Sequence, residues 1–151
     1  MRASLVVVCA LAAAWAGAGS AGAAPLKAPR PTPAQMRHVV REWSAYLNAG
    51  DNAGEARLFA LPATMIQGPY AYRLVSRAQV AAWHSGLPCS GKIISIKVHG
   101  LQADAVFRLG NRVSSKCDAP GTLAAARFTF AGGKISIWQQ IPPPSSSGSV
   151  A

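Results

Sequence analysis

Two pairs of extended segments in the C-terminal half most constrain what this chain can fold into. Each pair consists of two runs of β-branched and aromatic residues on either side of a short glycine-containing turn. The first pair is Lys92–Val98 with Ala103–Leu109, and the second is Thr122–Phe130 with Lys134–Ile141. Two successive hairpins predict a sheet in which neighbouring strands run antiparallel.

The first helix is predicted from a capping box and an apolar stripe. Thr32 can cap the helix, Pro33 suits its first position, and Gln35 can reach back to the cap. Apolar residues then recur at helical spacing, which indicates one buried face: Met36, Val39, Val40, Trp43 and Leu47. Gly50 is expected to end this helix.

Two shorter helices and two short strands complete the prediction. A second helix is expected from Asn52 through Phe59, followed by a strand at Ala63–Gln67 and an extended segment at Tyr70–Val75. A further capping box, Ser76 to Gln79, opens a third helix that ends near Gly86, with Val80 and Trp83 facing inward. The order predicts an α+β fold, with the helices packed on one face of a curved antiparallel sheet.

The ends of the chain indicate export. Residues 1–24 combine an early arginine, an apolar run and small residues before Pro25, which is the pattern of a cleaved signal peptide. Residues 25–31 form a proline-rich spacer, residues 32–141 one small domain, and residues 142–151 a tail expected to be disordered. We therefore expect a periplasmic or secreted protein without a transmembrane segment after signal removal.

Two cysteines remain once the signal peptide is removed. Cys89 and Cys117 have no Cys-x-x-Cys or Cys-x-x-His spacing, so neither a zinc site nor a thioredoxin-type pair is predicted. Pairing Val98 with Ala103 sets Lys92 opposite Leu109 and leaves both cysteines just beyond the open end of the hairpin. We expect a disulfide that stabilises the fold by roughly 3 to 4 kcal/mol.

The chain is strongly basic, with 15 Lys and Arg against 5 Asp and Glu. Such an excess can favour nucleic acids, anionic envelopes or acidic ligands. The basic residues are spread singly, however, and no basic run or basic helix occurs. An ordinary basic exported protein is favoured over a nucleic-acid-binding one, and an envelope-binding protein remains an alternative.

The layout resembles the nuclear transport factor 2-like (SnoaL-like) superfamily. The resemblance rests on Tyr46-Leu47-Asn48-Ala49-Gly50-Asp51, on Ala56 to Ala60, on Ser76 to Trp83, and on Phe128 to Trp138. It implies a cone-shaped α+β fold whose bent sheet wraps a long helix and leaves a pocket. The superfamily includes isomerases, cyclases, dehydratases and hydrolases as well as non-enzymatic binding domains, and its members are often homodimers. The resemblance therefore implies a pocket but not a reaction.

Catalytic residues are hard to find. Family enzymes often carry an acid just after the second helix, where this chain reads Ala60-Leu61-Pro62-Ala63. His84 is the one candidate general base, provided that the fold brings it a carboxylate. Asp51 and Glu55 read as helix-start residues, and no acid obviously faces a buried partner. The sequence leans against an enzyme and predicts no cofactor and no metal.

Aromatic and polar residues are the candidates for lining the pocket: Tyr70, Tyr72, Trp83, Arg108, Arg127, Trp138 and Gln140. For Trp138, as for Trp43, a place in the core is favoured over the pocket. For Arg108 and Arg127 the outer face of the sheet is favoured, because an unpaired buried arginine is rare. We hypothesise a non-catalytic domain that binds a small apolar or anionic molecule or a protein, with a SnoaL-like isomerase, cyclase or hydrolase as the alternative.

Overall fold

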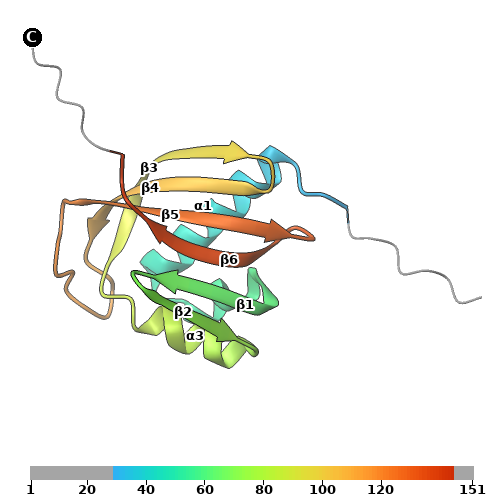
Figure 1. Cartoon of the computed structure of the whole chain (residues 1–151). Coiled ribbons are helices and arrows are strands. Elements are labelled where there is room, and N and C mark those ends of the chain that lie inside the picture. Colours follow the sequence, from blue (N-terminus) through green and yellow to red (C-terminus); the bar gives the residue numbers. More distant parts are fainter. Residues whose placement is uncertain (1–28, 145–151) are drawn as a thin grey trace, which may run out of the picture.

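A computed structural model describes residues 29–144 (Figure 1). The predicted signal peptide, the first part of the predicted proline-rich spacer and most of the predicted tail lie outside the described residues. The elements are α1 (Pro33–Ala49), α2 (Asn52–Arg57), β1 (Phe59–Gln67), β2 (Tyr70–Leu74), α3 (Arg77–Ser85), β3 (Ser90–His99), β4 (Gln102–Gly110), β5 (Leu123–Ala131) and β6 (Lys134–Ile141). No helix in this range is long and apolar enough to cross a membrane.

Six strands form one sheet in the order β2-β1-β6-β5-β4-β3. All neighbours pair antiparallel except β1 and β6, which run parallel, so the sheet is mixed. In Figure 1 the sheet lies across the front of the molecule with α1 behind it, while α3 lies below β2. This arrangement confirms the predicted α+β class, with helices against a curved sheet. The sheet was predicted to be antiparallel, and the parallel β1–β6 pair corrects this, because two strands so far apart in sequence are not joined by a hairpin.

The long helix forms for the reasons that the sequence suggested. The Thr32 hydroxyl accepts the backbone N–H of Gln35 at 3.2 Å, and the Gln35 side chain accepts the backbone N–H of Thr32 at 2.8 Å. At the other end Gly50 has φ +73°, a left-handed conformation that glycine adopts without steric cost. The helix therefore begins and ends as predicted.

The second helix differs from its prediction at its C-terminal end. Its cap is Asp51, whose carboxylate accepts the backbone N–H of Gly54 at 2.7 Å, and it ends at Arg57. Strand β1 consequently begins at Phe59 rather than at Ala63. A register shift between Phe59 and Thr64 gives Pro62 an irregular position in the strand, which suits a residue that lacks the N–H needed for regular pairing.

The first hairpin also corrects a prediction. Val98 pairs with Ala103 as expected, but Lys92 pairs with Arg108 rather than with Leu109. The difference of one residue arises from a register shift between Ile93 and Ser95, where Ile94 is an extra residue in β3. The sequence carried no glycine or proline at that point to indicate the bulge.

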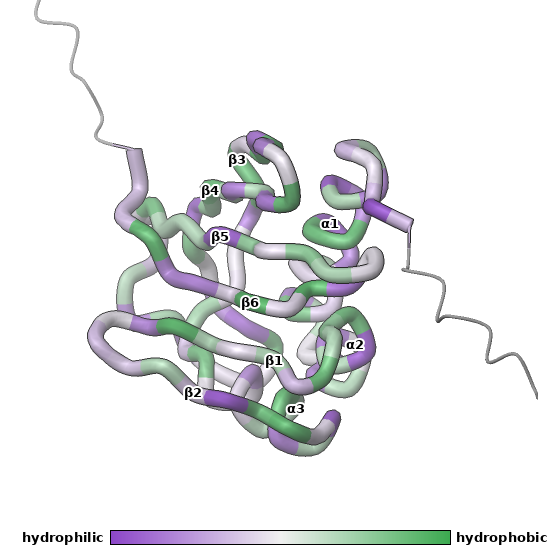
Figure 2. The backbone as a smooth tube through the Cα atoms, turned by 45° about the vertical axis from the view of Figure 1, so that its right-hand side comes forward, coloured by the Kyte–Doolittle hydropathy of each residue, from purple (hydrophilic) through white to green (hydrophobic). Residues whose placement is uncertain are grey.

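The core lies between α1 and the concave face of the sheet. Met36, Val40, Trp43 and Leu47 of α1 are buried there against side chains of the sheet. The Trp43 ring makes edge contacts with Phe107 and Phe128 at centroid distances of 5.7 and 5.1 Å, an arrangement that aromatic rings favour. Figure 2 shows hydrophobic positions recurring along α1 and β6, the elements that bound this core.

Candidate functional site

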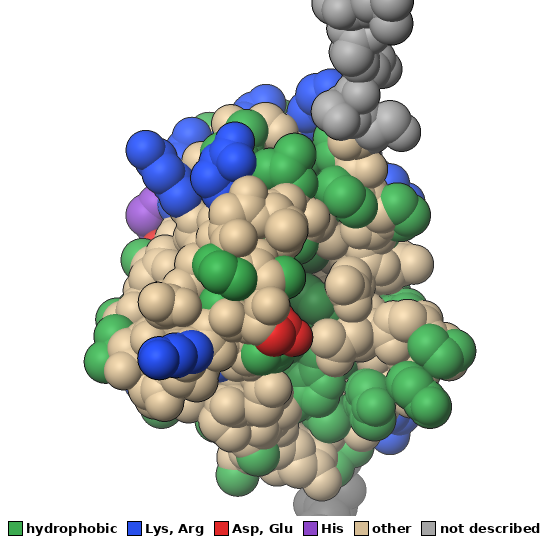
Figure 3. Space-filling model, turned by 90° about the vertical axis from the view of Figure 1, so that its left-hand side faces the viewer, with side chains coloured by type: hydrophobic (Ala, Val, Ile, Leu, Met, Phe, Trp, Pro, Cys, Tyr) green, Lys and Arg blue, Asp and Glu red, His purple; other side chains and the backbone are tan. Residues whose placement is uncertain are grey.

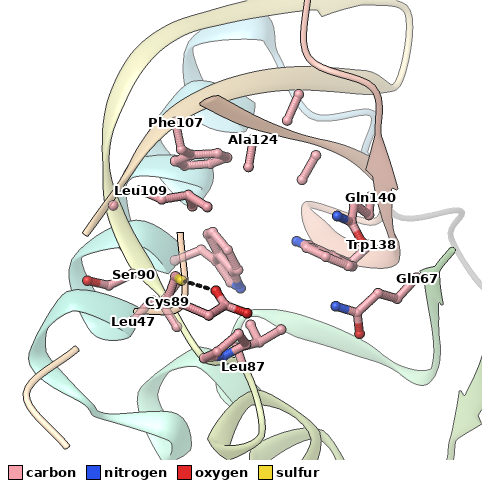
Figure 4. A pocket seen from close by; sticks show the side chains of 16 residues that line it. Leu47, Gln67, Leu87, Cys89, Ser90, Phe107, Leu109, Ala124, Trp138 and Gln140 are labelled. Carbon is pink, nitrogen blue, oxygen red and sulfur yellow. Dashed lines mark hydrogen bonds between the residues drawn. The ribbon is translucent and has the colours of Figure 1, made fainter. Parts of the chain in front are cut away.

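A cavity of about 250 Å³ opens between the C-terminal half of α1, the segment that follows α3, and the concave face of the sheet. Its walls are mainly apolar, with Leu47 and Leu87 on the helical side and Phe107, Leu109 and Ala124 on the sheet side (Figure 4). This volume is close to the lower end of what small-molecule sites occupy. The cavity therefore suits a molecule smaller than a steroid.

The polar side chains of the cavity are few. Gln67, Gln140 and Asp118 contribute amide and carboxylate groups, and no Lys, Arg or His is among its described lining residues. Figure 3 shows an acidic side chain beside a hollow with apolar side chains around it, while basic side chains lie toward the edge of this face. The site is thus an apolar hollow with an acidic and amide rim.

The indole nitrogen of Trp138 also belongs to the cavity wall. Trp138 is on β6, and Figure 4 shows its nitrogen pointing toward the cavity. The Nε1–H is buried and has no hydrogen-bond acceptor among the described residues. A buried donor without a partner carries a free-energy penalty of about 1–3 kcal/mol.

The predicted disulfide is present and forms part of the cavity wall. Cys89 bonds to Cys117, and Cys89 lines the cavity. Oδ1 of Asp118 lies 3.2 Å from Sγ of Cys89, a close contact in which the sulfur has no hydrogen to donate. These three residues are close enough for a metal site, but both sulfurs are used in the disulfide, so they are not thiolate ligands.

His84 lies behind the cavity and is completely buried. Val80 and His84 are the buried residues of α3, whereas Trp83, which was predicted to face inward, is only half-buried. The ring nitrogens of His84 are both engaged: Nδ1 donates to the carbonyl of Val80 at 2.8 Å, and Nε2 accepts the indole N–H of Trp43 at 2.9 Å. This pairing requires a neutral ring.

The fold brings His84 a carboxylate that the sequence did not reveal. Oε1 of Glu55 lies 3.9 Å from Nε2 of His84, and both side chains are fully buried. Glu55 does lie in the first turn of α2, as expected, but the expectation that no acid faces a buried partner was wrong. Packing of α2 against α3, which lie far apart in sequence, produces this pair, so no local pattern could indicate it.

Burial dominates the protonation of both groups. It raises the pKa of the Glu55 carboxyl to about 8, an effect that the charge of Arg112 opposes and that of Asp51 increases. It lowers the pKa of the His84 ring to about 4, although the hydrogen bond to Val80 acts in the opposite direction. Both residues are therefore uncharged near pH 7, and neither carboxylate oxygen of Glu55 has a hydrogen-bond partner among the described residues.

Arg112 ties the loop after β4 to this region. Its guanidinium donates to the carbonyls of His84 and Leu87 at 2.6 and 3.0 Å and to the Asn52 side chain at 2.8 Å. Arg112 is buried, and the sequence gave no reason to single it out. Because Leu87 lines the cavity, this arginine holds one of its walls in place.

Two of the predicted pocket residues, Trp138 and Gln140, line the cavity. Tyr70 and Tyr72 do not: they lie on strand β2, at the end of the sheet, and remain 63% and 43% exposed. Trp83 also lies outside the lining, packed edge-on against Trp138 with a centroid distance of 4.9 Å. The side chains of Trp138 and Gln140 on β6 thus reach the cavity, whereas the two tyrosines of the edge strand β2 do not.

Neither predicted arginine reaches the cavity. Arg127 pairs with Asp104 through two hydrogen bonds of 2.7 and 2.8 Å, and Arg108 donates to the carbonyl of Gly121. Asp104 and Arg108 alternate on β4 with Ala103, Ala105 and Phe107, which belong to the core, so both arginines lie on the outer face. The cavity therefore lacks the cationic groups that an anionic ligand would need.

No protein-family model and no curated protein sequence matches this chain. Solved structures do match it. A putative polyketide cyclase from Sinorhizobium meliloti has 13% identity and a TM-score of 0.58 over 71% of this chain and 98% of its own. An NTF2-like protein of unknown function from Cytophaga hutchinsonii has 10% identity and a TM-score of 0.59 over 72% and 90%.

A third similar structure was determined with a bound small molecule. It is a protein with a ketosteroid isomerase-like fold from Catenulispora acidiphila in complex with trimethylamine, with 18% identity and a TM-score of 0.54 over 77% of this chain and 90% of that one. Similarities at these low identities concern the fold. They confirm the nuclear transport factor 2-like fold that the sequence motifs indicated.

Proposed function

We propose that this protein, which has a nuclear transport factor 2-like fold, binds a small, largely apolar molecule in its cavity and does not catalyse a reaction of that molecule. The observation that carries the proposal is the cavity itself, which is apolar and bounded by side chains from helix and sheet. Apolar ligands bind such hollows because both surfaces leave water. The unpartnered Trp138 N–H at the wall also favours an occupant that supplies a hydrogen-bond acceptor.

The state of His84 supports a binding role without catalysis. A general base needs a free lone pair within hydrogen-bond reach of the substrate. The Nε2 lone pair of His84 is occupied by the Trp43 indole, and neither His84 nor Glu55 is among the residues that line the cavity. A similarly folded protein forms a complex with trimethylamine, which supports small-molecule binding by a fold of this kind.

Benzyl alcohol is a suitable probe because its ring is apolar and it is smaller than the cavity. We expect saturable binding of one molecule per chain in calorimetric titrations. Ala124→Leu places extra carbons in the cavity and should abolish binding. The matched control is Ala131→Leu on the same strand, since Ala131 is exposed and lies outside the cavity lining. Equal binding by both variants, or no binding by the wild type, would overturn the proposal.

Catalysis by a SnoaL-like isomerase, cyclase or hydrolase is the second candidate. The Glu55–His84 pair favours it, because strongly shifted pKa values concentrate at functional sites. Such a reaction needs Nε2 of His84 to be released from Trp43 and the pair to open toward the cavity. Turnover of a defined substrate that Glu55→Gln abolishes, with substrate binding retained, would establish this candidate over the first.

We further propose that the protein is exported. The Cys89–Cys117 disulfide supports this location, because such bonds persist in oxidising compartments. Alkylation of free thiols before and after reduction, on protein from separated cell fractions, tests the proposal. Recovery of the chain in the cytoplasmic fraction with two free thiols at Cys89 and Cys117 would contradict it.

A further inference from the structure

We infer that the ligand carries a cationic amine, which Asp118 binds at the rim while the apolar part of the ligand fills the cavity. This inference rests on the proposed function and adds the chemical class of the ligand. It follows from three observations: the pairing of the acidic residues, the position of Asp118, and the character of the cavity walls.

Asp118 is the exception among the acidic residues. Bases outnumber acids threefold in this chain, and all five acids are within the described range. Three of them lie within 4 Å of a histidine or arginine side chain: Glu42 with His38, Asp51 with Arg57, and Asp104 with Arg127. Glu55, 3.9 Å from His84, is fully buried and uncharged near pH 7. Asp118 has no such partner among the described residues, so its carboxylate is available to a cation from outside.

The fold places this carboxylate at the cavity. Asp118 lines the cavity and is exposed, so a bound ammonium group keeps part of its hydration. Its neighbour Cys117 is bonded to Cys89, which is itself part of the wall. The disulfide thus fixes the chain next to Asp118 and holds the carboxylate against the hollow, 3.2 Å from the Cys89 sulfur.

The remaining walls favour the same ligand and disfavour an anion. Trp43, Phe107 and Trp138 present aromatic rings, which interact favourably with cations and pack well against apolar groups. The described lining residues include no base that could pair with a carboxylate or phosphate. Gln67 and Gln140 add amide oxygens that accept hydrogen bonds from an amine.

Benzylamine and benzyl alcohol test the inference, because they have the same shape and differ in charge at pH 7. Calorimetric titrations at low salt are expected to give about two- to fivefold tighter binding of benzylamine to the wild type. Asp118→Asn should remove this preference, so that the ratio of the two affinities falls to about one. The matched control is Glu42→Gln, which removes one negative charge on α1 outside the cavity and should preserve the preference.

The outcomes separate this inference from the proposed function. Binding of both probes with no preference for benzylamine would overturn the inference and leave the binding function in place. An equal loss of benzylamine affinity in Asp118→Asn and Glu42→Gln would also overturn it, since the effect would then come from net charge. If neither probe bound to the wild type, both proposals would fall.

Discussion

The indole nitrogen of Trp43 donates to Nε2 of His84 across 2.9 Å of buried space. This hydrogen bond joins the long helix α1 to α3 through two residues 41 positions apart in sequence. It also fixes the tautomer of His84, because Nε2 must be the acceptor and Nδ1 the donor. A residue that the sequence offered as a base is thus part of the core that supports the cavity.

Loss of this hydrogen bond should destabilise the protein. Trp43→Phe leaves the buried Nε2 of His84 without a donor and removes part of a core side chain, which together should lower the free energy of unfolding by about 2–4 kcal/mol. Urea denaturation monitored by circular dichroism measures the change. Trp83→Phe is the control, because Trp83 is half-buried and should lose less. Equal losses in the two variants would contradict a special role for the Trp43–His84 pair.

The buried acid and base should produce a characteristic pH profile. The pKa of Glu55 is raised from 4.5 to about 8, so the stability it contributes is complete below pH 4.5 and is lost as the pH rises to 8. The pKa of His84 is lowered from 6.5 to about 4, so the stability it contributes is present above pH 6.5 and is lost as the pH falls to 4. Between pH 4.5 and 6.5 the two slopes oppose each other.

The free energy of unfolding should therefore fall by about 2 kcal/mol between pH 6.5 and pH 8, where Glu55 but not His84 contributes to the pH dependence. Glu55→Gln keeps the shape of the side chain and removes its titration, so it should abolish this fall. Urea denaturation at a series of pH values provides the measurement. A wild-type profile that rises over the same range would show that Glu55 is ionised in the folded protein.

The disulfide should contribute both stability and ligand selectivity. Cys89 and Cys117 are 28 positions apart, and closing a loop of that length stabilises a fold by roughly 3 to 4 kcal/mol in the chain-entropy model. The double variant Cys89→Ser, Cys117→Ser should lose about that amount in urea denaturation, and reduction of the wild type should match it. The variant should also bind benzylamine no more tightly than benzyl alcohol, because Asp118 is no longer fixed. Full selectivity without the disulfide would contradict that role.

The Asp104–Arg127 ion pair on the outer face of the sheet should contribute less to stability than the disulfide. Hydrogen bonds from Arg127 hold the pKa of the Asp104 carboxyl below its usual range, and His99 adds a contact of 3.3 Å. The pair is partly exposed and screened by solvent, so Asp104→Asn should cost only about 1 kcal/mol at pH 7. A double-mutant cycle with Arg127→Gln isolates the pair energy. A coupling energy near zero would mean that the Asp104–Arg127 ion pair contributes nothing to stability.

Local signals were sufficient for most of the fold. The capping residues Thr32 and Ser76 and the terminator Gly50 act as predicted, because these interactions join residues close in sequence. The two hairpins follow from their turns for the same reason. The bulge at Ile94 was missed, since it depends on how β3 fits its partner strand rather than on the residue itself.

The site was less accessible to sequence reasoning. Trp138 and Gln140 both line the cavity because alternate residues of a strand share one face. The contribution of Asp118 depends on a loop held by a disulfide, and that of Arg112 on contacts with two distant segments. Such side chains acquire their positions through tertiary packing, so the sequence gave no periodic signal for them.

A crystal structure of the protein with 4-bromobenzylamine tests the central claim most directly, because the anomalous signal of bromine locates the ligand without prior assumptions. We predict a single bromine site inside the cavity, in contact with apolar walls such as Phe107 and Leu109, with the amine within hydrogen-bond distance of Asp118. Bromine sites only on the outer surface, with the cavity unoccupied at saturating ligand, would contradict the claim that this cone is a binding site.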